Sequence, residues 1–142
     1  MSLPFDDNFR EIMIDVCPMG AVRMSKSDTW KTDPLHPNPL KRQRQVVARY
    51  FAYKNKVVET CNKLNYTLGN TLNITFYLPM PESWSNKKKS AFLHQPHKSK
   101  PDLDNLIKAF MDSMKKSDSD IYQITAEKRY DYQGYIIVKE FL

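Results

Sequence analysis

The sequence has 142 residues, of which 41% are hydrophobic, 12% aromatic and 27% charged. This length suits one compact domain, residues 1–142, and the apolar content excludes a chain that is disordered throughout. The formal net charge of +6 and the pI of about 9.3 favour a polyanionic partner such as nucleic acid, although charge alone does not identify one.

The sequence contains no apolar run of the length that a membrane-spanning helix needs. Its first residues have neither the basic start nor the apolar stretch of a signal peptide. The two cysteines, Cys17 and Cys61, form no CxxC pair, and we interpret both as reduced, buried thiols. We therefore expect a cytoplasmic protein that does not associate with membranes.

The first half of the chain predicts one strand and one long helix. Apolar residues alternate over residues 11–16, and residues 21–24 continue this strand or pair with it. Residues 25–38 are polar and rich in proline, which indicates a loop. Asn38 and Pro39 suit the cap and first position of a helix, and apolar residues at helical spacing extend it to residues 65–69.

The central part predicts a strand followed by a short basic helix. Residues 71–78 are rich in β-branched and aromatic side chains, with alternate apolar residues on one face, and two prolines end the strand. Ser83 suits the cap of a short helix that begins near Trp84 and carries three consecutive lysines.

The last third predicts an amphipathic helix and two strands. Leu103, Ile107, Phe110 and Met114 share one face of a helix. Residues 121–130 and 135–142 alternate as two strands of a terminal hairpin. The whole pattern predicts an α+β fold: a small mixed or antiparallel sheet, a long helix, a short lysine-rich helix, a site-bearing helix and a C-terminal β-hairpin.

Residues 100–108 gather two carboxylates, an amide and an amine at the start of the amphipathic helix. Carboxylate oxygens are the ligands that Mg²⁺ prefers, and Mg²⁺ needs few of them when a phosphate supplies the rest. Asp102 and Asp104 point the same way only if they lie at the boundary of the helix, since two positions inside it diverge by about 200°. A third acid must come from elsewhere, and Asp118 and Asp120 in the following turn are the candidates.

The same motif also has a simpler interpretation. An Asp-x-Asp at a helix start is commonly a cap that interacts with the helix dipole, and Asp104 with Lys108 is commonly a surface ion pair worth about 0.3–0.5 kcal/mol. Taken alone, the motif favours this interpretation. The three glycines are far apart, which excludes the glycine-rich loop of Walker-type nucleotide hydrolysis.

Three segments together resemble the RusA family of Holliday-junction resolvases, of the phage or prophage type. Residues 97–108, HKSKPDLDNLIK, resemble the family signature His-x-x-Lys/Arg-Pro-Asp-x-Asp-Asn-Leu-x-Lys. Residues 79–89, PMPESWSNKKK, resemble its proline, Ser-Trp-Ser and lysine block, and residues 125–130, TAEKRY, resemble its closing strand. The resemblance covers residues 71–130 in the expected order.

The resemblance implies a crossover junction endodeoxyribonuclease of DNA recombination and repair. It implies a metal-dependent phosphodiester hydrolase, with Mg²⁺ as cofactor and Mn²⁺ as the alternative ion. The expected substrate is a four-way DNA junction, in which a homodimer makes paired nicks.

Site residues follow from the same resemblance, position by position. Asp102 and Asp104 match the first two metal-binding acids, and Lys108 matches the lysine associated with catalysis. Asp118 falls on the third, catalytic and metal-binding acid when residues 125–128 are aligned, and Asp120 is the alternate third acid. The basic residues near these segments are expected DNA contacts: Arg23, Lys41, Arg42, Arg44, Lys87, Lys88, Lys89, Lys98 and Lys100.

Ser117 is the point at which the chain departs from the family, which has an adjacent acidic pair there. A catalytically weak or inactive protein that binds junctions in an architectural role is therefore the alternative. A metal-stabilised interaction module that never binds DNA is a further one. Incubation with a four-way junction, with and without Mg²⁺, separates the three.

Overall fold

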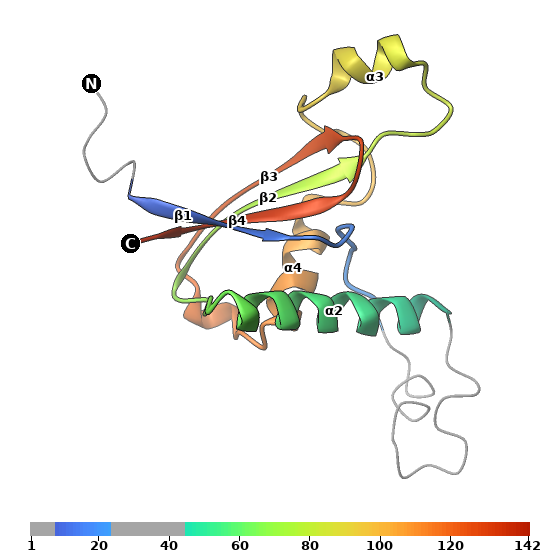
Figure 1. Cartoon of the computed structure of the whole chain (residues 1–142). Helices are drawn as coiled ribbons and strands as arrows, with labels where there is room; N and C mark the ends of the chain where they lie inside the picture. The colour runs from blue at the N-terminus through green and yellow to red at the C-terminus, as the bar shows by residue number, and fades with distance from the viewer. Residues whose placement is uncertain (1–7, 24–44) are drawn as a thin grey trace, which may run out of the picture.

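The computed structural model describes residues 8–23 and 45–142 of the chain (Figure 1). As predicted, the fold is α+β with a four-stranded mixed sheet. In the part of the chain that the structure describes, no helix is long and apolar enough to cross a membrane. The elements in chain order are β1 (Phe9–Ile14), α2 (Gln45–Lys63), β2 (Thr71–Pro79), α3 (Asn86–Phe92), α4 (Leu103–Ser113), the 3₁₀ helix η2 (Asp118–Asp120), β3 (Gln123–Asp131) and β4 (Tyr135–Phe141).

The strands lie in the order β1-β4-β2-β3. β4 is antiparallel to both of its neighbours, β1 and β2, whereas β3 runs parallel to β2 at one edge. In this register, Ile74 lies opposite Val138 on β4 and opposite Ala126 on β3. The sheet is therefore mixed, which decides between the two alternatives that the sequence left open.

The two C-terminal strands are present and are joined by three residues, but they are not neighbours in the sheet. β2 lies between them and pairs with both, so β3 and β4 form no ladder hydrogen bonds with each other. The predicted hairpin is therefore a short crossing over the end of β2, where the Met80 amide donates to the Asp131 carbonyl at 3.0 Å. Alternation of apolar residues predicts strands, but it does not say which strands pair.

Helices α2 and α4 cover one face of the sheet, and α3 projects beyond its end (Figure 1). The apolar residues of β2 that were predicted to share a face are all buried there, together with Ile12, Ile14 and Val138 from the neighbouring strands. On α4, Leu106 and Phe110 are fully buried. This face of the sheet and the two helices form the core.

Both longer helices end in the same way. In α2, Asn65 has a positive φ of 54°, and the Tyr66 amide donates to the Cys61 carbonyl at 2.8 Å. In α4, Lys115 has the same φ, and the Lys116 amide donates to the Met111 carbonyl at 3.2 Å. These are Schellman motifs, which satisfy the last carbonyls of a helix. They end each helix sharply without a glycine.

Several sequence expectations need correction or fall outside the described residues. Residues 21–23 are not a strand, and the cap of α3 is Ser85, whose Oγ accepts from the Lys88 amide at 3.2 Å. Cys61 is a buried thiol as expected, but Cys17 is exposed. The predicted start of the long helix at Asn38 lies outside the described residues.

Candidate active site

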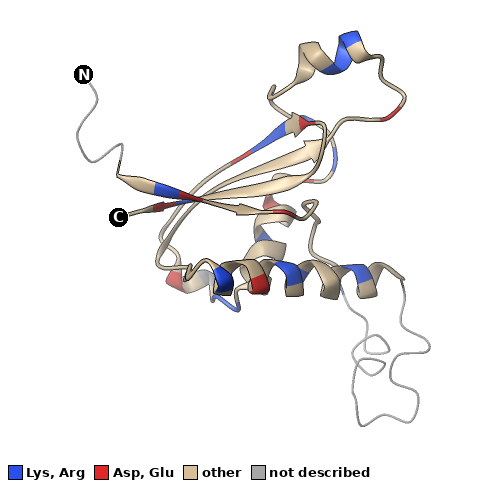
Figure 2. Cartoon of the chain, viewed as in Figure 1, with Lys and Arg blue, Asp and Glu red and all other residues tan. Residues whose placement is uncertain are grey.

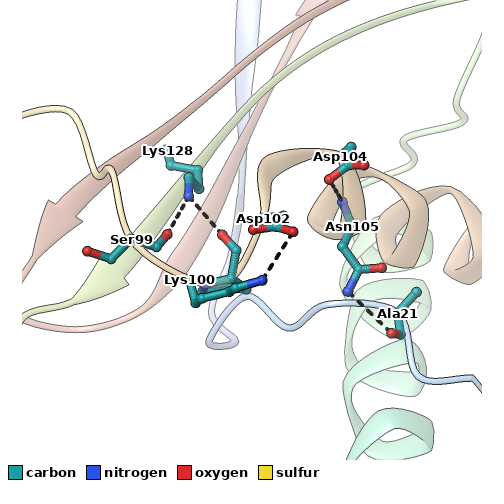
Figure 3. A network of polar contacts seen from close by, with 8 residues as sticks. Ala21, Ser99, Lys100, Asp102, Asp104, Asn105 and Lys128 are labelled. Atoms are coloured by element: carbon teal, nitrogen blue, oxygen red, sulfur yellow. Dashed lines mark hydrogen bonds and ion pairs between the residues drawn. The ribbon is translucent and has the colours of Figure 1, made fainter.

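The amino-terminal end of α4 carries the two acids of the motif. Asp102 occupies the cap position with an extended backbone, at φ −68° and ψ 141°, and its carbonyl accepts the first helical hydrogen bond from Leu106 at 3.1 Å. Its carboxylate makes no capping hydrogen bond. Instead it lies 3.5 Å from Nζ of Lys100, and both side chains are mostly exposed (Figure 3). The acid is therefore open to a ligand.

Asp104 lies in the first turn of α4 and is also exposed. Its Oδ1 accepts a hydrogen bond from the Asn105 amide at 2.9 Å. Its other oxygen has no partner among the described residues. Two exposed carboxylates thus lie at the positive end of the α4 dipole, where negative charge is stabilised. Since Asp102 does not cap the helix with its side chain, the interpretation of this motif as a cap accounts for only part of it.

Asn105 fastens this end of α4 to the segment that follows β1. The Ala21 amide donates to the Asn105 carbonyl at 3.2 Å, and the Asn105 side-chain amide donates to the Ala21 carbonyl at 3.4 Å (Figure 3). Gly20 makes this approach possible, because a Cβ there would lie 2.4 Å from Nδ2 of Asn105. The first turn of α4 is thereby held by two backbone segments distant in sequence.

Lys128 of β3 holds the loop that precedes α4. Its Nζ donates to the Ser99 carbonyl at 2.6 Å and to the Pro101 carbonyl at 2.8 Å (Figure 3). These two carbonyls flank Lys100. The loop that carries Lys100 and leads into Asp102 is therefore tied to the edge of the sheet.

His97 of the motif lies at the same edge. Its amide donates to the Lys128 carbonyl at 3.0 Å, and its ring packs on Tyr130 at 4.4 Å between centroids. Burial, together with the positive charge of Lys128, lowers the pKa of His97 below its ordinary value. The imidazole is thus neutral at neutral pH, which suits a packing role.

The predicted basic residues are distributed over the loop and the projecting helix. Lys98 and Lys100 are exposed in the loop, and the lysines of α3 are visible as a basic segment away from the body of the sheet (Figure 2). Lys88 differs from its neighbours because its Nζ lies 4.2 Å from the centre of the Trp84 ring. Lys108 is exposed one turn after Asp104.

The remaining basic residues are less informative. Arg23 is exposed at the end of the first described segment. Lys41, Arg42 and Arg44 lie outside the described residues.

The candidates for the third acid lie at the opposite end of α4. Asp118 and Asp120 belong to η2, which follows the carboxy-terminal end of the helix, and α4 has 11 residues, or about 16 Å of rise. The Asp120 carbonyl accepts from the side-chain amide of Asn70 at 2.8 Å, which fastens η2 to the start of β2. At the amino-terminal end of α4, the residue that β3 contributes is Lys128, whose Nζ donates to the Pro101 carbonyl.

The donor chemistry at Asp102 and Asp104 fits a hard divalent cation, since both side chains offer exposed carboxylate oxygens. Among the side chains that the structure describes, which do not include that of Asp118, no group of three or more His, Cys, Asp or Glu residues is placed to hold a metal ion. The described side chains thus offer two acids at this end of α4.

A comparison with protein-family models matches residues 15–139 to the endodeoxyribonuclease RusA. This match covers most of the 142-residue chain. The chain belongs to the RusA endodeoxyribonuclease family. Family membership supports nuclease activity, the hydrolysis of phosphodiester bonds in DNA. No curated protein matches the sequence.

The RusA match includes every segment that forms the acidic end of α4. Sequence reasoning found Asp102 and Asp104 but missed two residues that hold them. Asn105 was read only as part of the motif, and its contact with Ala21 has no local signal in the sequence. Lys128 stood inside the TAEKRY segment, but a period-2 pattern would have shown only that its side chain lies on the same sheet face as Ala126 and Tyr130.

Proposed function

We propose that this RusA-family chain is a metal-dependent endonuclease that resolves four-way DNA junctions by paired hydrolysis of phosphodiester bonds. The observation that carries the proposal is the pair of exposed carboxylates at the amino-terminal end of α4, in a chain of an endodeoxyribonuclease family. The Asp102 side chain makes no capping hydrogen bond, and Asp104 uses only one of its oxygens for the Asn105 amide, so both carboxylates keep oxygens open to a ligand.

Asp102 and Asp104 would hold Mg²⁺, or Mn²⁺ in its place, through their carboxylate oxygens. The bound ion would lower the pKa of a water molecule and stabilise negative charge on the phosphate. Lys108, exposed on the turn of α4 that follows Asp104, would place a positive charge beside the phosphate oxygens. Lys100, which already lies beside Asp102, would help to attract the anionic backbone.

The third acid remains Asp118 in this proposal, with Asp120 as the alternate. Because η2 lies at the far end of α4 in the same chain, we propose that two copies complete the site, with the acids of η2 facing the Asp102–Asp104 pair of the other copy. Tyr122, two residues after the end of η2, is 80% exposed, and Ile124 is 42% exposed. Exposed apolar side chains beside η2 suit a surface that a second copy covers. A symmetric homodimer would also give the two sites that paired nicking needs.

The basic loop and the projecting helix α3 supply the DNA contacts in this proposal. The proposed phosphate contacts among the described lysines are Lys87, Lys88, Lys89, Lys98 and Lys100; the Trp84 ring, 4.2 Å from Nζ of Lys88, would support this set. Arg23 and the basic residues at 41, 42 and 44 are further proposed contacts. Such contacts release counterions, so the affinity for junctions should fall steeply as the salt concentration rises.

The decisive experiment is cleavage of a synthetic four-way junction, with a linear duplex and a flap as comparison substrates, in the presence and absence of Mg²⁺. Symmetrical nicks that require the metal and disappear in Asp104→Asn are the expected result. If the wild-type protein binds the junction but leaves it intact in Mg²⁺ and in Mn²⁺, the proposal is wrong.

A second function has an observation in its favour. Ser117 stands where the family has an acid, so one member of the adjacent acidic pair is missing from this chain. A protein with this site would bind junctions in an architectural role without cutting them. The same experiment distinguishes this function, because it predicts tight binding to the junction without nicks.

A further inference from the structure

The ammonium group of Lys128 is bonded to backbone carbonyls and not to any described carboxylate. Lys128 is half-buried on β3, and Nζ donates to two neutral backbone carbonyls, those of Ser99 and Pro101, at 2.6 and 2.8 Å. No described carboxylate forms an ion pair with it. Partial burial of an ammonium group is costly unless hydrogen bonds compensate for the lost water, and bonds from a charged donor are the stronger kind. The charged group of Lys128 is therefore used to hold the loop at residues 99–101.

Its place in the sheet explains why it reaches the loop. Lys128 lies opposite Phe76 in the parallel register, so its side chain leaves the sheet on the same face as that buried ring. This is the face that α4 covers. The stem of Lys128 thus runs toward the helix, and the ammonium group meets the chain just before α4 begins.

The loop is held to β3 in two ways along its length. Residues 94–97 are held by backbone hydrogen bonds, from His94 to Tyr130, from Tyr130 to Gln95 and from His97 to Lys128. Beyond His97 this backbone pairing stops. Among the described residues, the two bonds from Lys128 are the hydrogen bonds that join residues 98–101 to the sheet. The Lys128 side chain therefore holds the loop to β3 from the point where the backbone hydrogen bonds end.

We propose that Lys128 is a positioning residue for the nuclease site: by holding the carbonyls on both sides of Lys100, it sets the direction in which Lys100 and Asp102 meet the substrate phosphate. This inference rests on the proposed function. Lys128 itself does not bind the metal or the reacting atoms. Its effect reaches the chemistry through the loop, whose displacement would separate Asp102 from Asp104, which Asn105 and Ala21 hold independently.

The test compares three variants with the wild-type protein. Lys128→Met keeps a long apolar stem and removes the donors, whereas Lys128→Arg keeps the donors and the charge. Lys139→Met is the matched control, because Lys139 lies on the opposite face of the sheet, with Nζ 4.8 Å from the centre of the Phe9 ring. Three quantities are measured: amide hydrogen exchange over residues 98–106, the single-turnover rate of junction cleavage at saturating protein, and the dissociation constant for the junction.

For Lys128→Met we expect faster exchange in this segment and a cleavage rate lower by roughly 10- to 100-fold, because a small displacement of a reacting group is costly. The dissociation constant should change by less than about threefold, since the phosphate contacts remain. Lys128→Arg should recover most of the rate, and Lys139→Met should behave as the wild type in all three measurements.

The inference is overturned if Lys128→Met cleaves at the wild-type rate, or if its exchange over residues 98–106 is unchanged. It is also overturned if Lys128→Arg is as impaired as Lys128→Met. The arginine keeps donors and charge, so equal impairment would mean that the position requires the packing of lysine and not its donors. Should the wild-type protein cleave no junction, the proposed function fails, and the exchange comparison alone then decides whether Lys128 positions the loop.

Discussion

The two ends of α4 treat their polar groups in opposite ways. At the carboxy-terminal end, the Schellman motif satisfies the last carbonyls, Ser113 Oγ donates to the Ala109 carbonyl at 2.8 Å, and Asp112 accepts from Tyr50 at 3.1 Å. Burial and the neighbouring Asp112 raise the pKa of Tyr50 well above its ordinary value, so that this bond persists across the physiological range. The polar groups at this end stabilise the fold.

At the amino-terminal end, the Asp102 carboxylate caps nothing and Asp104 keeps one oxygen free, although the backbone around them is firmly held. A rigid backbone with unused exposed carboxylates is what a ligand site requires. The difference between the two ends teaches that the free acids, and not the presence of acids as such, mark the functional end of the helix.

The largest effect should come from removing one free acid. We expect Asp104→Asn to lower the rate of junction cleavage by at least about 100-fold, because it removes a proposed metal ligand. Asp112→Asn at the other end of α4 is the matched control and should cleave normally while losing about 1 kcal/mol of unfolding free energy. Single-turnover kinetics and urea unfolding measure the two effects. Normal cleavage by Asp104→Asn would show that the two ends do not differ in function.

The proposed pairing of opposite ends in a dimer predicts complementation. Asp104→Asn and the double variant Asp118→Asn/Asp120→Asn should each be inactive alone. After the two are mixed and allowed to exchange subunits, about a quarter of the wild-type sites should recover, since half of the dimers are mixed and each has one intact site.

Two measurements complete the complementation experiment. Binding of Mn²⁺, followed by electron paramagnetic resonance, should recover in parallel with nicking, and sedimentation should show a dimer. A mixture that stays inactive, beside a wild-type protein that cleaves, would place all three acids in one chain.

A smaller effect is expected where the amino-terminal end of α4 is anchored. Gly20→Ala places a Cβ against the side chain of Asn105 and should cost about 1–3 kcal/mol of unfolding free energy. Gly69→Ala is the control, because nothing lies within 4 Å of the added Cβ. Urea unfolding compares the two variants. Equal stability of both would mean that Asn105 moves aside freely and that this anchor is weak.

The smallest effect on stability should come from Lys100→Met. Its ion pair with Asp102 is mostly exposed, and such pairs contribute about 0–1 kcal/mol. Binding should nevertheless respond: the slope of log affinity against log salt concentration should become shallower by roughly 0.9 if Lys100 contacts one phosphate. A melting curve and a salt titration with a four-way junction measure the two quantities. An unchanged slope would remove Lys100 from the DNA contacts.

Much of this architecture was predictable because its signals are local. The alternation in β2 predicted its buried face, and the motif at residues 97–108 predicted where the acids of α4 begin. The cap of α3 was predicted two residues too early, at Ser83, and the hydrogen bond from the Lys88 amide to Ser85 Oγ shows that Ser85 is the cap.

The rest depends on contacts between distant residues. That β2 separates β3 from β4 follows from strand pairing, which periodicity does not determine. The contact of Asn105 with Ala21 joins residues 84 positions apart. The position of η2 relative to Asp102 follows from the length of α4 and from the register of β3, in which Gln123 pairs with Thr71. The sequence offered no measure of that register.

The strand order also has a consequence for how the protein is made. β4 is the last of the four strands in the chain, yet it fills the position between β1 and β2, with Ile14 opposite Ile136 and Phe9 opposite Phe141. During synthesis, β1 and β2 both lack β4, the strand that lies between them, because β4 emerges from the ribosome after the other three strands. Such pairings over long stretches of chain are slow to form. We therefore expect the nascent chain to remain without its complete sheet until β4 has left the exit tunnel.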